Sequence, residues 1–391
     1  MFLEFFYSIL LVFKPQYVHL CIIYMNIGII CYPTFGGSGV VATELGKALA
    51  AQNHNIHFIS YDQPVRLDVF TENLFYHEVS FNNYPLFKYA PYEIALTSKI
   101  VDIVKVHKIE VLHVHYAIPH AAAAATAKHI LAREGIKIKI VTTLHGTDIT
   151  LVGKDKSYEP VVTYSLQESD VVTAVSESLK KDTYSFFNYT GEIHVVPNFI
   201  DFQRFNKQPK DHFKKGIAPN SERILVHTSN FRKVKRVPDV LAIYRRVAAK
   251  IPAKLLLIGD GPERASIEAE CRNCDICKDV IFLGKQEAVE EILSIADLFL
   301  IPSETESFGL AALEAMACEV PVISTNTGGL PEVNIDGLTG YTSNIGDVDK
   351  MAADALTILK DENLAQFKAQ AKKHSLKYQL KNILPLYQAL Y

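Results

Sequence analysis

Residues 304–314 read E-T-E-S-F-G-L-A-A-L-E and lie between two runs of apolar residues. The preceding run, residues 296–303, predicts a short buried strand with its exit loop. The following run, residues 310–318, is rich in Ala, Leu and Met and favours a helix. The stretch therefore predicts a turn from a strand into a helix. Ser307 can cap this helix, and Gly309 would let a ligand approach the backbone of its first turn.

The predicted turn combines two features that suit different parts of one ligand. A helix N-terminus offers unpaired N–H groups and the positive end of the helix dipole, which suit a phosphate. The stretch also holds Glu304, Glu306 and Glu314, whose carboxylates would repel a bare phosphate. A nucleotide-sugar resolves this conflict, because amides and nearby cations can bind its phosphates while carboxylates bind its hydroxyls. The alternative is an acidic helix N-terminus without a ligand, with Glu314 in solvent.

Length and composition bound the class of protein. The 391 residues are enough for two domains with sizeable cores. A formal net charge of −3 argues against a nucleic-acid partner. With 49% hydrophobic and 21% charged residues, the composition is that of an ordinary soluble globular protein. The six cysteines show no pairing framework, which fits a reducing cytoplasm.

Residues 1–24 are apolar but differ from the usual membrane segments. Their first apolar run, residues 5–13, is too short to span a bilayer, and Glu4 stands where a signal peptide has basic residues. A membrane anchor or a signal peptide stays an alternative. We expect instead that translation starts at Met25 and that residues 1–24 are an extension without stable membrane insertion.

Strand and helix patterns alternate along the rest of the chain, which predicts parallel, doubly wound sheets. The alternation restarts at residue 224 after a polar crossing, residues 203–220, so we place the domain boundary near residue 202. Ligands of such sheets bind beyond the carboxyl ends of the strands. The main buried strand patterns are residues 26–32, 57–60, 110–115, 137–144, 170–175, 194–196, 224–228, 254–258, 280–283, 298–302 and, as the final strand, 321–324.

Polar residues follow several of these strands. Gly36 and Gly37 lie between the first strand and its helix, a geometry that suits an anion. His145 opens H-G-T-D after the strand at residues 137–144, where a histidine is more often structural than functional. A basic loop, S-N-F-R-K-V-K-R at residues 229–236, carries Arg232 and Lys235. These cations could stabilise a departing diphosphate, and the alternative is a solvated basic turn.

The acidic stretch resembles the donor site of the retaining family 4 glycosyltransferases. Glu306 and Glu314 are separated by seven residues with S-F-G between them, as in the family's signature. The resemblance implies the GT-B fold, an α/β fold in which two Rossmann-like, doubly wound domains face each other across a cleft. It implies that Glu306 holds hydroxyls of the transferred sugar and that Glu314 accepts both ribose hydroxyls. Further residues expected to contact the sugar-nucleotide donor are Gly36, Gly37, Arg232, Lys235, Ser307, Phe308, Gly309 and Leu310.

The same resemblance divides the chain and the catalytic work. Residues 25–202, joined by a C-terminal helix at about residues 375–391, would bind the acceptor, and residues 203–374 would bind the nucleotide-sugar. Glu306, Lys235, Arg232 and His145 are the expected catalytic residues. In the family an Arg usually stands five residues before the Lys, but Asn230 occupies that position here. Arg232 would then have to substitute.

Longer strings resemble a bacterial subgroup of this family that transfers N-acetylglucosamine from its UDP derivative to L-malate, on the route to bacillithiol. The match runs in register from about Met25 nearly to the end and includes C-Y-P-T-F-G-G-S-G-V-V-A-T-E-L-G-K, H-V-H-Y-A-I-P-H and T-T-L-H-G-T-D-I-T. L-malate needs donors for two carboxylates, and Ser38, Tyr116, Thr143 and Arg232 could supply them. Alternatives are another acceptor, such as inositol phosphate or a lipid-linked sugar, and a non-catalytic UDP-sugar sensor. A homo-oligomer stays possible.

Two residue sets have the composition of metal sites. Cys271, Cys274 and Cys277 have a spacing seen in zinc and iron–sulfur sites, but they lack an evident fourth ligand and are expected at the surface. Residues 113, 115, 120 and 145, all His, form the second set with Asp148. We expect neither set to bind a metal, and we expect no cofactor. The resemblance implies that positively charged side chains of the protein replace the magnesium ion that other transferases use. It also implies that the leaving phosphate takes the acceptor proton, without a protein base.

Overall fold

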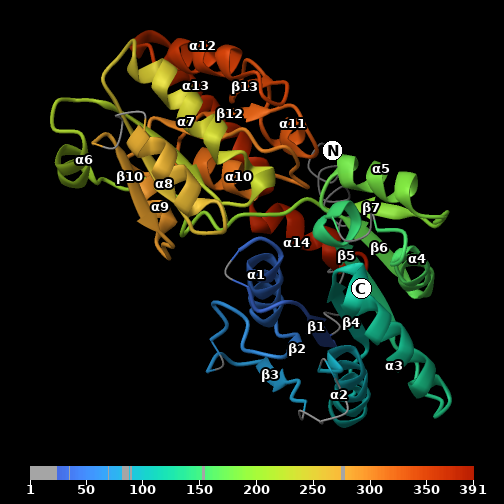
Figure 1. Cartoon of the computed structure of the whole chain (residues 1–391). Coiled ribbons are helices and arrows are strands. Elements are labelled where there is room, and N and C mark those ends of the chain that lie inside the picture. The colour runs from blue at the N-terminus through green and yellow to red at the C-terminus, as the bar shows by residue number, and fades with distance from the viewer. Residues whose placement is uncertain are drawn as a thin grey trace, which may run out of the picture.

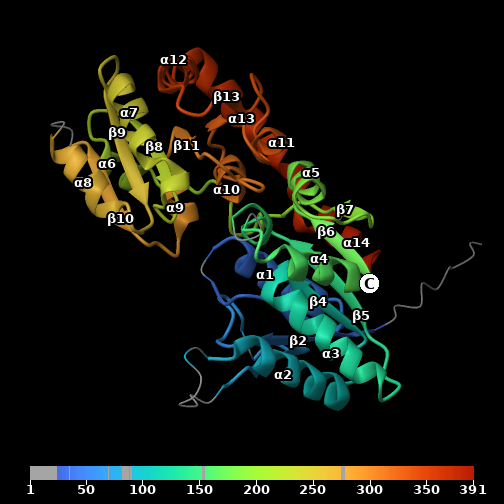
Figure 2. The same cartoon turned by 45° about the vertical axis from the view of Figure 1, so that its right-hand side comes forward.

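The computed structural model describes residues 24–34, 36–68, 70–81, 88, 90–151, 155–273 and 278–391. The expectation for residues 1–24 therefore concerns a segment of which only Tyr24 is described. Within the described ranges, no helix has both the length and the apolar character needed to cross a membrane. The described chain forms two parallel sheets, each with its own set of helices (Figures 1 and 2).

The first sheet has seven strands in the order β3-β2-β1-β4-β5-β6-β7. One face packs on α1 and α14 and the other on α2 and α3, through two apolar cores. The strands are β1 (Asn26–Ile30), β2 (Asn55–Ser60), β3 (Leu74–Glu78), β4 (Val111–His115), β5 (Lys139–Leu144), β6 (Val171–Ala174) and β7 (Ile193–Val195). The helical segments are α1 (Ser38–Ala50), α2 (Tyr92–His107), η1 (Ala117–Ala121), α3 (Ala122–Ala132), η2 (Thr147–Leu151), α4 (Glu159–Glu168) and α5 (Glu177–Phe186).

The second sheet has six strands in the order β10-β9-β8-β11-β12-β13. Its two faces also pack on separate cores, one with α7 and α12 and the other with α9 and α10. The strands are β8 (Arg223–Thr228), β9 (Ala253–Ile258), β10 (Val280–Gly284), β11 (Leu298–Ile301), β12 (Val322–Thr325) and β13 (Gly340–Ser343). The helical segments are α6 (Asp211–Ile217), η3 (Lys233–Lys235), α7 (Val237–Ala248), α8 (Arg264–Asn273), α9 (Val289–Leu293), α10 (Leu310–Ala317), α11 (Leu330–Val333), α12 (Val348–Ile358) and α13 (Asp361–Ser375).

The chain crosses between the two halves twice, and the crossings lie side by side. The backbone N–H of Ile200 donates to the carbonyl of Tyr378 at 2.9 Å, and Ile200 forms a parallel bridge with Gln379. After the second crossing, η4 (Leu376–Tyr378) leads into α14 (Leu380–Gln388), which buries Ile383 and Tyr387 in the first sheet's core beside α1 (Figure 1). The C-terminal helix thus packs with the first half of the chain.

Two observed strands, β3 and β13, are absent from the predicted set. Both are the last strand at one edge of a sheet, and the middle of each strand is only partly buried. A strand buried on both faces is a continuous apolar run, whereas an edge strand needs no such run. The predicted pair of doubly wound parallel sheets is confirmed, and these two edges extend it.

Candidate active site

The turn after β11 has the predicted strand-to-helix geometry but a different cap. Gly309 is the N-cap of α10 with φ +96°, and no side chain caps this helix, so the expected Ser307 cap is wrong. Ser307 stands two residues earlier, and its carbonyl accepts a hydrogen bond from the Ser176 hydroxyl at 2.6 Å. A Cβ at Gly309 would lie 2.7 Å from Leu330 Cδ2, so close packing adds to the need for glycine. Phe308 is buried and packs edge-on against Tyr378.

The basic loop and the acidic turn meet through one ion pair. Lys235, at the end of η3, lies 2.6 Å from Oε1 of Glu306, and Ser303 donates to the same oxygen at 2.9 Å. The N–H of Glu304 also donates to the carbonyl of Val234, which holds the two loops together. The two charges predicted to bind opposite ends of a sugar diphosphate therefore neutralise each other.

Arg232 belongs to the same basic loop but takes no part in this pair. Its side chain is exposed and forms no ion pair with any described residue. Its guanidinium, three residues from Lys235 in the sequence, is therefore free of ion pairs within the described part of the chain.

The loop after β5 contacts the acidic turn across the two halves of the chain. A Cβ built at Gly146 would lie 1.5 Å from Oγ of Ser307, and the φ of Gly146 is +111°. Close by, the N–H groups of Glu177 and Ser178 donate to the carboxylate of Glu332, each at 3.0 Å. The start of α5 is thus hydrogen-bonded to α11, and the loop after β5 packs against the acidic turn at Ser307.

Asp148 holds the first-half loops together, although it was expected only within a rejected metal set. Its carboxylate is 2% exposed and accepts hydrogen bonds from the backbone N–H of Ala117 at 2.8 Å and of Gly146 at 3.1 Å. Burial raises the pKa of Asp148 to about 6, and these backbone hydrogen bonds limit the rise. We regard it as a positioning residue, and its place within H-G-T-D was the sequence signal that could have indicated it.

His145 lies against two other rings at the same edge of the sheet. Its Nε2 is 2.7 Å from Nδ1 of His115, and its ring centroid is 5.3 Å from that of Tyr116. Burial lowers the pKa of His145 to about 3, so the ring is neutral at neutral pH. Among the described residues, no hydrogen-bond partner occupies its Nδ1, which leaves this atom for a ligand. A neutral imidazole suits hydrogen bonding to a hydroxyl rather than charge stabilisation.

The glycine loop before α1 is open toward solvent. A Cβ built at Gly36 or Gly37 would meet no atom within 4 Å, and Gly37 is the N-cap of α1 with φ +58°. Ser38 opens the helix, and its hydroxyl lies 2.5 Å from that of Tyr116. Tyr116 itself is held at φ +85° and packs edge-on against Tyr32. The loop therefore combines free space with a pair of hydroxyl groups.

Thr143 does not present its hydroxyl at this edge of the sheet. The prediction that this hydroxyl donates a hydrogen bond to the acceptor is therefore wrong. It is 0% exposed, and its Oγ1 lies 2.7 Å from both His113 Nε2 and Thr173 Oγ1. Nδ1 of His113 is in turn 2.7 Å from the hydroxyl of Tyr391. Thr143 is therefore a member of a buried polar chain behind the site.

Glu314 interacts electrostatically with a group of charges that the sequence did not indicate. Burial raises the pKa of its carboxyl to about 7, and the guanidinium groups of Arg66 and Arg204 oppose this rise. Arg204 pairs with Glu290 at 3.1 Å, and Arg66 reaches Glu44 at 4.0 Å. Arg66 comes from the loop after β2, so this cluster also joins the two halves of the chain.

The structure bears on both metal sets considered from the sequence. Cys274 and Cys277 lie outside the described residues, and Cys271 is buried in the core beside α7, not at the surface as expected. In the second set, His113 bonds to Thr143, while Nδ1 of His120 bonds to the carbonyl of His115 at 2.6 Å. Hydrogen bonds within the protein therefore already occupy one ring nitrogen of His113 and one of His120.

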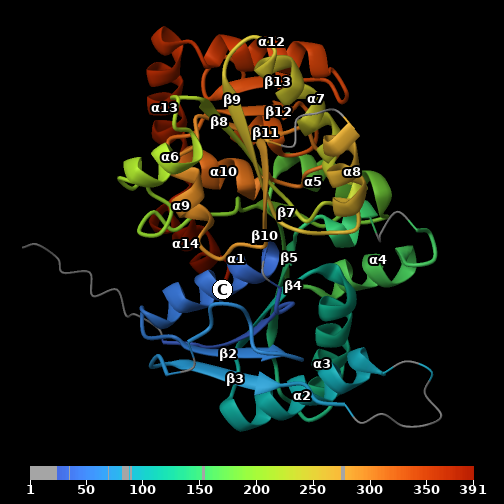
Figure 3. The ribbon, with the colours of Figure 1, turned by 60° about the vertical axis from the view of Figure 1, so that its left-hand side comes forward.

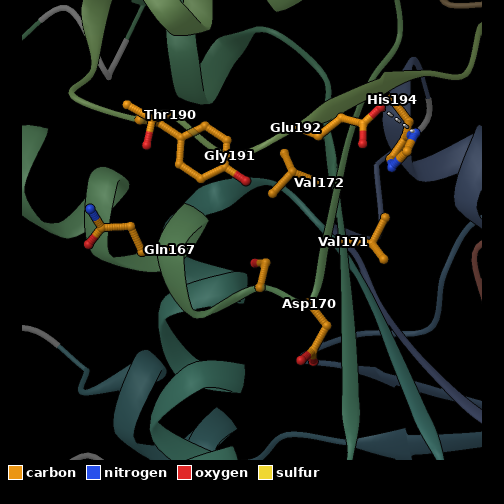
Figure 4. A pocket seen from close by; sticks show the side chains of 10 residues that line it. Gln167, Asp170, Val171, Val172, Thr190, Gly191, Glu192 and His194 are labelled. Atoms are coloured by element: carbon orange, nitrogen blue, oxygen red, sulfur yellow. Dashed lines mark ion pairs between the residues drawn. The ribbon is translucent and has the colours of Figure 1, made fainter.

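One hollow of the surface lies elsewhere and is not part of the site. It has a volume of about 420 Å³ and includes Asp170, Glu192 and His194 (Figure 4). Asp170 and Glu192 directly precede β6 and β7, so the hollow lies at the amino ends of these strands. Asp170 is already paired with Lys128 at 2.8 Å. Ligands of doubly wound sheets bind at the opposite edge.

Comparisons with known proteins agree with this arrangement. The family model described as Glycosyltransferase Family 4 matches residues 35–204, and that described as Glycosyl transferases group 1 matches residues 208–374. N-acetyl-alpha-D-glucosaminyl L-malate synthase of Bacillus anthracis is 47% identical over 94% of this chain and 96% of its own. An uncharacterized glycosyltransferase of Methanocaldococcus jannaschii is 26% identical over 89% of this chain and 92% of its own.

Solved structures show the same fold at low sequence identity. Anabaena HepE in complex with UDP and glucose has a TM-score of 0.79 and 18% identity, over 94% of this chain and 99% of its own. Sucrose-phosphate synthase from Thermosynechococcus elongatus has a TM-score of 0.76 and 20% identity, over 94% and 98%. The predicted GT-B fold is confirmed.

Proposed function

We propose that this chain, which belongs to the family 4 glycosyltransferases, transfers N-acetylglucosamine from UDP-N-acetylglucosamine to the hydroxyl of L-malate. The observation that carries the proposal is the identity of 47%, over nearly the whole of both chains, with the Bacillus anthracis synthase. The product would be the first intermediate toward the thiol bacillithiol. The six cysteines without a pairing framework fit work in the cytoplasm.

The donor side of the proposal rests on the pair of Lys235 and Glu306. At 2.6 Å this pair is preformed, and a sugar diphosphate could divide it by giving phosphate to the ammonium and hydroxyls to the carboxylate. Lys235 would then stabilise the negative charge that develops on the departing UDP. Glu314 would accept the ribose hydroxyls, and the first N–H groups of α10, which no side chain of the described residues caps, could bind the phosphates.

The reaction would exchange one bond for another at the anomeric carbon. The bond from this carbon to the UDP oxygen breaks, and the malate hydroxyl oxygen forms the new bond on the same face of the sugar. The hydroxyl proton passes to the departing phosphate, so no protein base is needed. The neutral ring of His145 supports this scheme, because its Nδ1 can bind a sugar hydroxyl without competing for the proton. We propose that no metal ion takes part.

The acceptor would lie against the first half of the site. The open glycine loop and the Ser38–Tyr116 hydroxyl pair suit one carboxylate of malate. The exposed Arg232 could bind the second carboxylate in the two-point geometry that a guanidinium allows. Thr143 would act from behind, by holding its strand through the buried chain that includes His113.

The test is a screen of donors and acceptors with purified protein. We expect UDP release only when UDP-N-acetylglucosamine and L-malate are both present, with the product anomer assigned by NMR. Inositol phosphate in place of malate tests the nearest alternative acceptor. A protein that binds UDP-N-acetylglucosamine in a calorimeter but releases no UDP with any acceptor would be a sensor, and the proposal would be wrong.

A further inference from the structure

Three histidines converge at a part of the first sheet that the proposed reaction does not use. His57 lies on β2, His77 on β3, and His107 is the last residue of α2. One ring nitrogen from each lies within 4.8 Å of the others, and Nδ1 of His57 is 2.9 Å from Nε2 of His77. Figures 1 and 3 show β2, β3 and α2 at the end of the molecule away from the six-stranded sheet.

The register of the sheet and the end of α2 bring the three rings together. β2 and β3 are parallel, with His57 opposite Phe75 and Ile59 opposite His77, so the two histidines share one face. α2 packs on this face through its apolar residues and ends at His107. The ring centroid of His107 is 4.5 Å from that of His57 and 4.9 Å from that of His77.

The environment keeps two of the rings neutral. Burial, helped by the neighbouring His107 and His77, lowers the pKa of His57 to about 3. Burial, His107 and Lys99 lower the pKa of His77 to about 4. Neutral imidazole is the form that ligates metals, because each ring then has one nitrogen with a free lone pair. His57 is 2% exposed, whereas His77 and His107 are half-buried and leave one side of the cluster open.

We propose that His57, His77 and His107 bind one divalent transition-metal ion, with Zn²⁺ as the best fit. A set of three imidazole ligands suits zinc, copper or nickel rather than magnesium or calcium. Zn–N bonds of about 2.0–2.1 Å place tetrahedral ligand nitrogens about 3.3 Å apart, so the separations here need only small side-chain shifts. His57 would carry its proton on Nε2 and His77 on Nδ1, so both neutral rings bind without releasing a proton. Water would complete the site.

The ion would act on the structure of the first half and not on sugar transfer. Its ligands come from three different elements: the internal strand β2, the edge strand β3 and the helix α2. A bound ion would fix β3 and the end of α2 to β2. The cluster holds neither of the groups that form the donor pair, Lys235 and Glu306, so transfer should continue without the metal.

The experiment is a calorimetric titration of Zn²⁺ into the chelator-treated, untagged full chain. We expect one Zn²⁺ per chain. Loss of a residue that only hydrogen-bonds to a metal ligand costs about 10–100-fold in metal affinity, and loss of a ligand itself should cost no less. His77→Gln and His107→Gln should therefore each weaken zinc binding by at least about tenfold. His212→Gln, which changes an exposed histidine on α6, is the matched control and should bind as the wild type does. The two half-buried positions are chosen because replacing the buried His57 can unfold the strand.

Two further measurements decide between this site and adventitious binding. Bound Co²⁺ should give the intense visible spectrum of a four-coordinate ion, and both variants should lose it. Zn²⁺ should raise the thermal midpoint of the wild type and of His212→Gln, but not of the two cluster variants. Equal zinc affinity in all four proteins, a six-coordinate cobalt spectrum, or loss of sugar transfer on chelation would each overturn the proposal.

Discussion

Replacing Gly146 by Ala should push apart the two loops that meet at the site and lower the rate of transfer. The added Cβ would lie 1.5 Å from Oγ of Ser307 and 2.6 Å from its Cβ, where ordinary contacts begin at 3.4 Å. Rotation about χ1 can move Oγ of Ser307 away, but its Cβ cannot turn, so the loops would have to move apart by about 0.8 Å, the difference between 3.4 and 2.6 Å. Because a misplacement of about 1 Å can cost about 100-fold in rate, we expect kcat/KM to fall about 100-fold, or roughly 2.7 kcal/mol.

The matched control for Gly146→Ala is Gly135→Ala. Gly135 also has a positive φ, +77°, but a Cβ built there meets no atom within 4 Å. Both changes place an L-residue in a conformation that costs about 1–3 kcal/mol, so both should lower the thermal midpoint by a similar, small amount. Only the first should reduce transfer strongly.

The assay measures initial rates of UDP release against both substrates, with thermal unfolding of each variant alongside. Adding Ser307→Gly to Gly146→Ala removes the side chain that the new methyl group strikes, so part of the lost rate should return. Ser307→Gly alone gives the reference for this comparison. A Gly146→Ala enzyme with the same kcat/KM as Gly135→Ala would show that the two loops do not meet during the reaction.

Lys235→Ala and Glu306→Ala should each lower kcat by more than about tenfold, or roughly 1.4 kcal/mol, in a turnover assay. The double variant should lose less than the sum, because the two side chains form one pair. Burial raises the pKa of Glu314 to about 7, so its carboxylate forms as pH rises through that value, and UDP should bind about tenfold more weakly at about pH 6 than at about pH 8. Calorimetry should show that Glu314→Gln lacks this difference, and identical pH profiles would contradict the ribose role. Ser38→Ala and Tyr116→Phe should raise the malate KM without changing UDP affinity, and lactate, with one carboxylate fewer, should be a poor acceptor. Equal rates with lactate and malate would exclude the two-carboxylate pocket.

The order of buried strands and helices was readable from the sequence because parallel strands covered on both faces are continuous apolar runs. β1, β4 and β5 were predicted to within two residues at either end. β3 and β13 could not be found in this way, since an edge strand exposes part of its length and needs no apolar run. The start of α10 after Gly309 was equally readable, because the Ala- and Leu-rich run that follows favours a helix.

Local sequence patterns thus define the two α/β units and the short segments that carry the polar groups. Which of those groups meet depends on how the chain packs in three dimensions. Lys235 and Glu306 are 71 residues apart and form an ion pair, whereas the side chain of Arg232, three residues from Lys235, forms no ion pair with any described residue. Thr143 turned inward to His113 because its neighbours on both sides bury it. Contacts of this kind depend on strand register and on the packing of one half against the other, and no local pattern of residues records either.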